Sequence, residues 1–375
     1  MTHNSHTARY MLYLVLVLLW PLSAVAHDRN IGAVYTMSNA ASGNTVLVFK
    51  RDRVGKLTPA GEFPTNGLGT GAGLGNQGAV ILDPANRWLF VANPGSNDIT
   101  VFALGENGLS FVGLTPSNGQ QPISLTYSRN LLYALNAGGN VGSTDSITGF
   151  TVGPNGTLSA IPGSTRPLSA AATGPAQIQF NSDGDLLVVT EKATDLIDTY
   201  TVDSAGMPSG PNTRLSVGTT PFGFAFGKRD QLFVSEAAGG AQGLSSVSSY
   251  RVAKDGGLDV ISSAIGTTET AACWVVVSND GRFAYTTNAG SGSVSAYRIA
   301  FDGTIRLRDP GGRTGLTGKD SAPIDMALSN DGRNLYTLNS GDATVSAFRV
   351  KANGGLARLP RLTGLPATAN GLAAR

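Results

Sequence analysis

The spacing of apolar runs and turn residues over residues 323–356 predicts four short strands joined by tight turns. Apolar runs cover residues 324–329, 334–339 and 344–350, and a fourth run begins at Leu356. Between them lie an Asn-Asp-Gly turn at 330–332, a glycine-bearing loop at 340–343 and an Asn-Gly-Gly turn at 353–355. Turn residues of this kind between short apolar runs are typical of β-hairpins. The stretch therefore predicts a four-stranded antiparallel sheet.

An aromatic residue in the third strand of this unit recurs along the chain at intervals of 47 to 53 residues. The seven aromatics are Phe49, Phe102, Phe150, Tyr200, Tyr250, Tyr297 and Phe348. A turn glycine follows each of them a few residues later, at Gly55, Gly108, Gly156, Gly206, Gly256, Gly303 and Gly354. A fixed period of this size, with strand chemistry inside it, indicates a solenoid or a propeller. We therefore predict an all-β fold, a seven-bladed β-propeller of four-stranded antiparallel blades.

The first unit lacks its first strand, and the far end of the chain can supply it. Residues 31–57 carry a second and a third strand, whereas residues 364–374 resemble the opening of the 323–356 unit. We expect the C-terminal strand to join the N-terminal blade, because such closure removes the open edge of a ring of sheets. Residues 27–375 are thus predicted to form a single propeller domain.

Residues 1–26 have the features of a secretory signal peptide. Arg9 supplies the positive charge, residues 11–20 form the apolar run, and residues 24–26 offer a small-residue cleavage site. The apolar run is shorter than the roughly 20 residues that a membrane-spanning helix needs. We predict a protein that is exported to the periplasm or secreted, with no membrane insertion after cleavage.

Composition excludes several classes of function. Charged residues make up 14% of the chain, the formal net charge is +2, and no run of Lys or Arg occurs. The sequence therefore lacks the basic cluster that binding to nucleic acid or to an anionic membrane requires. After the leader the only histidine is His27, which leaves neither a base for a Ser-His-Asp triad nor ligands for a zinc site. Cys273 is the single cysteine, so no intramolecular disulfide forms. We predict no cofactor and no metal.

Two motifs that could suggest ligands have simpler structural interpretations. The Asp-Gly pairs at Asp183, Asp280 and Asp331 could suggest calcium, but they recur at the same hairpin of three units, where turn chemistry explains them. The glycines of residues 67–78 have the spacing of a dinucleotide loop, but a strand follows them instead of the required helix. We expect a loop between two blades there.

The repeat also shows where individual units depart from the common pattern. At the end of the second strand most units have Asn, as at Asn93, Asn288 and Asn339, where the amide can hydrogen-bond the backbone of the turn. Two neighbouring units have Glu191 and Glu236 instead. Two carboxylates in adjacent sheets suit acid–base chemistry, or the binding of a cation or of sugar hydroxyls.

A second column of unusual residues lies at the third position of the innermost strand. It holds Gln177, Trp274 and Asp325, and Gln77 takes the position of the opening proline in its own unit. The start of strand one lies beside the end of strand two in an antiparallel sheet, so we expect both columns at one mouth of the central channel. They predict either a polar pocket with one apolar wall or a hydrogen-bonded plug.

Three of the units, at residues 89–93, 285–288 and 335–339, resemble the Tyr-Val-Thr-Asn type of propeller repeat. Through all seven units the chain resembles the seven-bladed lactonase family, which includes 6-phosphogluconolactonase and a carboxymuconate-lactonising enzyme. The resemblance implies a lactonase activity. A phosphorylated substrate would need convergent Arg or Lys side chains, and the inward columns have none.

We therefore expect an exported hydrolase of a small or sugar-derived lactone. Glu191 or Glu236 would activate water, and Trp274 would stack on the sugar ring. Gln77, Gln177 and Asn288 would polarise the carbonyl, with Asp325 in the same pocket. The alternative is a non-catalytic propeller of the cell envelope that binds a small ligand or a protein partner on the same face.

Overall fold

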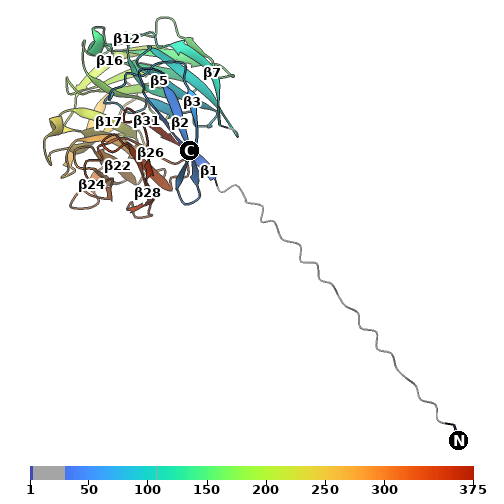
Figure 1. Cartoon of the computed structure of the whole chain (residues 1–375). Helices are drawn as coiled ribbons and strands as arrows, with labels where there is room; N and C mark the ends of the chain where they lie inside the picture. Colours follow the sequence, from blue (N-terminus) through green and yellow to red (C-terminus); the bar gives the residue numbers. More distant parts are fainter. Residues whose placement is uncertain (3–29, 107) are drawn as a thin grey trace.

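The computed structural model describes residues 1–2, 30–106 and 108–375, and within them the chain forms seven antiparallel sheets arranged in a ring (Figure 1). The described residues contain two short 3₁₀ helices, η1 (Gly138–Val141) and η2 (Ala238–Gly240), and none of their helices is long and apolar enough to cross a membrane. The predicted seven-bladed β-propeller is confirmed. The predicted leader lies outside the described residues apart from its first two.

Each sheet is one blade, and the blades are numbered here in chain order. Blade 1 consists of β31 (Asn370–Ala374), β1 (Asn30–Met37), β2 (Thr45–Asp52) and β3 (Leu57–Pro64), from the channel outwards. Blade 2 consists of β4 (Val80–Leu82), β5 (Trp88–Asn93), β6 (Asp98–Gly105) and β7 (Gly108–Pro116). Blade 3 consists of β8 (Pro122–Ser128), β9 (Leu131–Asn136), β10 (Ser146–Val152) and β11 (Leu158–Ala160).

The remaining four blades repeat the same meander. Blade 4 consists of β13 (Pro175–Phe180), β14 (Leu186–Glu191), β15 (Leu196–Val202) and β16 (Pro208–Leu215). Blade 5 consists of β17 (Pro221–Phe226), β18 (Gln231–Glu236), β19 (Ser246–Val252) and β20 (Leu258–Gly266). Blade 6 consists of β21 (Ala272–Val277), β22 (Phe283–Asn288), β23 (Ser293–Ile299) and β24 (Ile305–Leu307). Blade 7 consists of β26 (Pro323–Leu328), β27 (Asn334–Asn339), β28 (Thr344–Val350) and β29 (Leu356–Arg358).

In three blades the outermost strand is interrupted. The third strand then pairs with a second short piece, which is β12 (Arg166–Pro167), β25 (Gly315–Leu316) or β30 (Leu362–Thr363). The four-stranded plan is kept, because both pieces lie along the same edge of the third strand.

The turn glycines of the repeat are required by backbone geometry. All seven have a φ angle between +79° and +117°. This left-handed region is costly for residues that carry a Cβ atom, so glycine fixes the hairpin between the third and fourth strands of each blade. The Asp-Gly pairs at Asp183, Asp280 and Asp331 likewise precede glycines with positive φ, at hairpins between the first and second strands.

The core lies between adjacent blades. The seven marker aromatics of the third strands are all buried, with exposed fractions of 0 to 5%. Burying one such side chain stabilises the fold by about 1.5–3 kcal/mol. Tyrosine hydroxyls of second strands link neighbouring blades: those of Tyr133, Tyr285 and Tyr336 donate to the turn-glycine carbonyls of the next blade, over 2.6 to 3.1 Å. The repeat therefore specifies packing between blades as well as strands within them.

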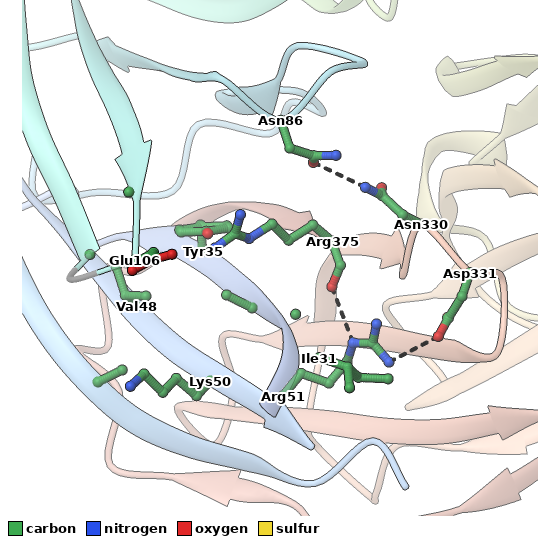
Figure 2. Close-up of a pocket in the computed structure, with 15 residues that line it drawn as sticks. Ile31, Tyr35, Val48, Lys50, Arg51, Asn86, Glu106, Asn330, Asp331 and Arg375 are labelled. Atoms are coloured by element: carbon green, nitrogen blue, oxygen red, sulfur yellow. Dashed lines mark hydrogen bonds and ion pairs between the residues drawn. The ribbon is translucent and has the colours of Figure 1, made fainter. Parts of the chain in front are cut away.

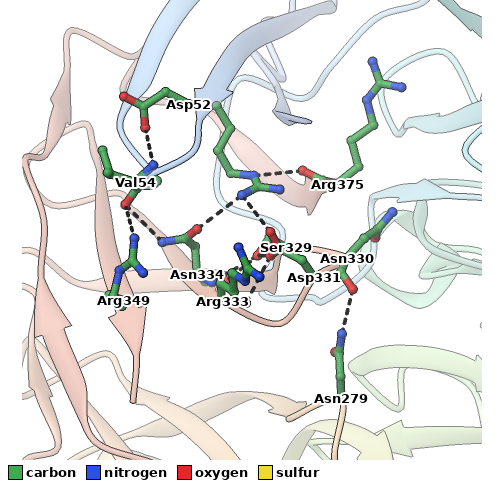
Figure 3. A network of polar contacts seen from close by, with 12 residues as sticks. Asp52, Val54, Asn279, Ser329, Asn330, Asp331, Arg333, Asn334, Arg349 and Arg375 are labelled. Atoms are coloured by element: carbon green, nitrogen blue, oxygen red, sulfur yellow. Dashed lines mark hydrogen bonds and ion pairs between the residues drawn. The ribbon is translucent and has the colours of Figure 1, made fainter. Parts of the chain in front are cut away.

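The ring closes as the sequence predicts. In blade 1 the C-terminal β31 pairs with the N-terminal β1, with Val34 opposite Ala374 and Met37 opposite Asn370. A buried arginine, Arg51 of β2, reinforces this closure. Its partners Arg375, Asp331 and Asn334 are labelled in Figure 3. Its Nε donates to the main-chain carbonyl of Arg375 over 3.1 Å, and its Nη1 lies 3.2 Å from Asp331 Oδ2 of blade 7. We call Arg51, its two partners and Asn334 the clasp.

Candidate functional site

The glycine-rich segment expected between two blades fills one end of the central channel. Residues 74–78, called the plug here, run from blade 1 to blade 2 and hydrogen-bond to inner strands around the ring. The main-chain N–H of Gln77 donates to Ala176 of blade 4 over 3.0 Å, and its carbonyl accepts from Ser124 Oγ of blade 3 over 2.6 Å. The indole Nε1 of Trp274 in blade 6 donates to the carbonyl of Asn76 over 2.6 Å.

A lysine that the sequence analysis did not single out holds the same segment. Lys192 Nζ donates to the carbonyls of Gly75 and Pro175 over 2.5 and 2.8 Å, and lies 4.8 Å from the ring centroid of Phe222. Burial lowers the pKa of the Lys192 ammonium to about 8. The signal was present in the repeat: the residue after the second strand is Pro, Ala or Ser in blades 2, 3, 5, 6 and 7, and lysine only in blade 4.

The glutamine side chains predicted at the channel pair with the backbone of another blade's inner strand. Gln177 Nε2 donates to the carbonyl of Phe224 over 2.9 Å, and its Oε1 accepts from the N–H of Phe224 over 2.8 Å. Gln77 makes the same two bonds to Val275, at 3.0 and 3.1 Å. These amides satisfy buried backbone groups that would otherwise cost about 1–3 kcal/mol each.

The side-chain amide of Gln77 also explains why the inner strand of blade 5 has a glycine, Gly223, at the position that Gln177 occupies in blade 4. A Cβ atom on Gly223 would lie 2.3 Å from Gln77 Oε1 and 2.5 Å from the carbonyl oxygen of Cys273. No side chain fits there, so the plug supplies the amide that pairs with blade 6. Of the two expected arrangements, a polar pocket or a hydrogen-bonded plug, this end of the channel therefore has the plug.

A cavity of about 250 Å³ remains within the channel, and we call it the channel cavity. Three of the predicted site residues, Gln77, Gln177 and Asp325, line it. The rest of the wall is apolar or uncharged, with Ile81, Leu82, Leu125, Thr126, Tyr127, Ile178, Gln179, Met326 and Leu372 among its residues. No Arg or Lys lines it. The volume lies just below the range for small-molecule sites, about 300–1,000 Å³.

Asp325 is the one carboxyl group that lines the channel cavity. Its side chain is 2% exposed. Oδ1 accepts from the N–H of Met326 over 2.7 Å, and Oδ2 has no partner among the described residues. Burial raises the pKa of the carboxyl to about 8, although N–H groups of Met326 and Leu372 partly offset the effect. A carboxyl with this pKa can accept or donate a proton near neutral pH.

The two predicted catalytic glutamates lie elsewhere, fully buried inside the blades. Glu191 accepts from the N–H and Oγ of Ser169 over 3.0 and 2.5 Å, and from Thr194 Oγ1 over 2.5 Å. Glu236 accepts from the N–H of Gly218 over 3.1 Å and from the hydroxyl of Ser246. Neither residue lines a cavity described here. The expectation that both columns converge on one channel mouth is wrong for the glutamate column, because these side chains turn towards the loops between blades.

The asparagines at the same strand position in other blades show why the glutamates do not reach the channel. Asn288 Nδ2 donates to Ser293 Oγ and Ser295 Oγ over 3.0 and 2.9 Å, and Asn339 makes equivalent bonds to Thr344 and Ser346. Their partners are third-strand hydroxyls, not the turn backbone as expected. Asn288 is therefore buried away from the channel cavity. Trp274 is also excluded from it, since the indole packs on Phe222 with ring centroids 4.9 Å apart.

Glu191 has an acidic neighbour that the sequence analysis missed. Asp198 occupies the position where other third strands carry Thr100, Ser295 or Ser346, is fully buried, and has no hydrogen-bond partner among the described residues for either oxygen. Burial, and then Glu191, raise the pKa of Asp198. Outside residues 3–29 and 107, the chain has no group of three or more His, Cys, Asp or Glu residues that could hold a metal ion.

The single cysteine is buried. Cys273 is 5% exposed and does not line the channel cavity, and burial raises the pKa of its thiol to about 12. Such a thiol is neutral and packs as a small apolar side chain.

These features define the class of protein: a seven-bladed propeller whose channel is plugged at one end and retains a small polar cavity. The family model for the lactonase 7-bladed beta-propeller matches residues 26–141 and 216–322. The chain therefore belongs to the seven-bladed β-propeller lactonase family, as the sequence resemblance indicated. No curated protein matches it in sequence.

Solved structures share the fold over nearly their whole length. A Bacteroides fragilis protein described as a "putative 6-phosphogluconolactonase" has 20% identity and a TM-score of 0.70, over 93% of this chain and 99% of that one. The Pseudomonas aeruginosa periplasmic gluconolactonase has 17% identity and a TM-score of 0.66, over 90% and 98% of the two chains. A Lactobacillus plantarum protein has 15% identity and a TM-score of 0.71, over 92% and 99%. At these identities the likeness shows the fold alone.

Proposed function

We propose that the protein hydrolyses a small, sugar-derived lactone in the channel cavity, with Asp325 as the general base. The observation that carries the proposal is the Asp325 carboxyl, which lines the cavity, has one oxygen without a partner and has a pKa near 8. Membership of the lactonase family supports the reaction class.

The reaction follows from this placement. The Asp325 carboxylate takes a proton from a water molecule, whose oxygen forms a bond to the lactone carbonyl carbon. The ring C–O bond of the tetrahedral intermediate then breaks, and the protonated Asp325 returns its proton to the leaving alkoxide. The product is the open hydroxy acid. Gln179 Nε2 and the Thr126 hydroxyl proton have no acceptor among the described residues and serve as donors to the carbonyl oxygen.

The substrate is an unphosphorylated lactone. A phosphate group requires positive partners, and the channel cavity has no Arg or Lys in its wall. The comparison protein from P. aeruginosa is described as a periplasmic gluconolactonase, which supports both this substrate class and export. We propose that residues 1–26 direct export.

The decisive experiment is a lactone assay with three forms of the purified protein. Wild type is tested on gluconolactone, 6-phosphogluconolactone and γ-butyrolactone, beside Asp325→Asn and Glu236→Gln. We expect turnover of gluconolactone, a loss of about 10²–10⁴-fold in Asp325→Asn, and activity retained in Glu236→Gln. Thermal unfolding of each variant confirms that it is folded.

Two results would overturn parts of the proposal. Full activity in Asp325→Asn together with loss of activity in Glu236→Gln would show that Glu236, and not Asp325, is the general base. Tight lactone binding with no turnover by any form would instead favour the non-catalytic binding propeller.

A further inference from the structure

A second cavity lies where the two ends of the folded ring meet, and we call it the closure cavity (Figure 2). Its volume is about 1060 Å³. In the other blades a hairpin joins the innermost strand to the second strand, but in blade 1 these are β31 and β1, from opposite ends of the chain. The corresponding hairpins of blades 2 and 7, at Asn86 and Asn330, border the space that remains. The closure cavity shares no residue with the channel cavity.

Positive side chains outnumber negative ones in the wall of this cavity. Lys50, Arg51 and Arg375 line it, against the two carboxylates Asp331 and Glu106. Asp331 is already paired with Arg51 through the clasp. Among the described residues, no carboxylate side chain lies within ion-pair distance of Lys50 or Arg375. The Nε of Arg375 is buried and has no hydrogen-bond partner there.

The Arg51 guanidinium is also held in place. Arg51 is 2% exposed, and two of its nitrogens are fixed by the Arg375 carbonyl, Asp331 and Asn334. The third nitrogen has no partner among the described residues and points into the cavity in Figure 2. Rigid N–H groups in a partly desolvated site bind anionic oxygens well, because little side-chain entropy is lost.

Hydroxyl-binding groups surround these cations. Tyr35 lies beside the Arg375 guanidinium. Asn330 Nδ2 donates to Asn86 Oδ1 over 3.0 Å, which leaves one N–H of Asn330 and both N–H groups of Asn86 for a ligand. Glu106 is the remaining acceptor on the blade 2 side. We propose that the closure cavity is a binding site for a small hydroxylated carboxylate, with Arg375 and Lys50 binding the carboxylate and Tyr35, Asn86 and Glu106 binding the hydroxyls.

Isothermal titration calorimetry with gluconate tests this proposal without any lactone turnover. We expect gluconate to bind, and acetate and glucose to bind at least 10-fold more weakly, because each has only one of the two features recognised. Arg375→Gln and Lys50→Gln should each weaken gluconate binding about 10-fold, the effect of losing one charge-assisted hydrogen bond. Glu106→Gln should strengthen it a few-fold by removing a like charge.

Two controls distinguish binding in the closure cavity from non-specific attraction by the charge of the protein and from binding in the channel cavity. Lys254→Gln, an exposed lysine on a turn of blade 5, should leave gluconate affinity unchanged. Arg375→Gln should leave lactone hydrolysis unchanged, since Arg375 does not line the channel cavity. Three results would overturn the proposal: no gluconate binding up to about 10 mM, equal binding of glucose, or unchanged affinity in both Arg375→Gln and Lys50→Gln.

Discussion

The side-chain amide of Gln77 lies against the main chain of Val275, accepting from its N–H and donating to its carbonyl across 198 positions of sequence. A residue from the loop before blade 2 thus completes the inner strand of blade 6. The plug is therefore part of the channel wall, and its removal exposes or leaves unpaired the backbone groups that it satisfies.

We predict that Gln77→Ala destabilises the protein by about 2–4 kcal/mol, because it leaves a buried N–H and a buried carbonyl without partners. Denaturant unfolding measures the loss. Gln242→Ala, at an exposed loop position, is the matched control and should change the free energy of unfolding by less than about 0.5 kcal/mol. Equal stability of the two variants would contradict the role assigned to the plug.

The clasp depends on a glycine. A Cβ atom on Gly32 would lie 2.0 Å from the carbonyl oxygen of Arg375 and 3.0 Å from Arg51 Nε. Gly32→Ala should therefore cost about 1–3 kcal/mol or more through overpacking. Gly113→Ala is the control, since a Cβ atom there would meet nothing within 4 Å. Thermal unfolding should show a lower Tm for the first and little change for the second; equal Tm values would show that closure tolerates displacement of the clasp.

The buried carboxyl of Asp198 should make stability depend on pH. In the unfolded chain this group loses its proton near pH 4, whereas in the folded protein burial and Glu191 raise its pKa. The folded state then binds more protons above pH 4, so the free energy of unfolding falls as pH rises through the neutral range. Asp198→Asn should flatten this fall. A variant whose Tm declines between pH 5 and 8 as steeply as the wild type would refute the assignment.

The sequence was sufficient for the fold and for part of the site. The third-strand aromatics and the turn glycines, such as Phe348 and Gly354, mark packing and backbone constraints that recur in every blade, so their period predicts the ring. Part of the inner-strand column was also placed correctly: Gln177 and Asp325 line the channel cavity, whereas Trp274 does not. These positions follow from the pleat, which sets the face of each residue in a strand.

The glutamates were misplaced because a strand end does not fix side-chain direction. Glu191 and Glu236 accept hydrogen bonds from hydroxyl and N–H groups near the strand end. Replacing the asparagine of the common pattern by glutamate therefore does not direct the side chain into the channel. The third strand of blade 4 carries a sequence signal for the buried acidic pair, since Asp198 replaces a hydroxyl there. The contact of Trp274 with Asn76 joins residues 198 positions apart and has no local signal.

The proposed mechanism depends on Asp325 as the base in the channel cavity. The most direct test is the pH dependence of kcat/KM for gluconolactone. The raised pKa of Asp325 predicts that kcat/KM increases with pH and levels off above about pH 8, as the carboxylate form becomes complete. The Asp325→Asn variant should lose this limb together with most of its activity. A limb near pH 4 in the wild type, or an unchanged limb near pH 8 in an active Asp325→Asn variant, would contradict the account.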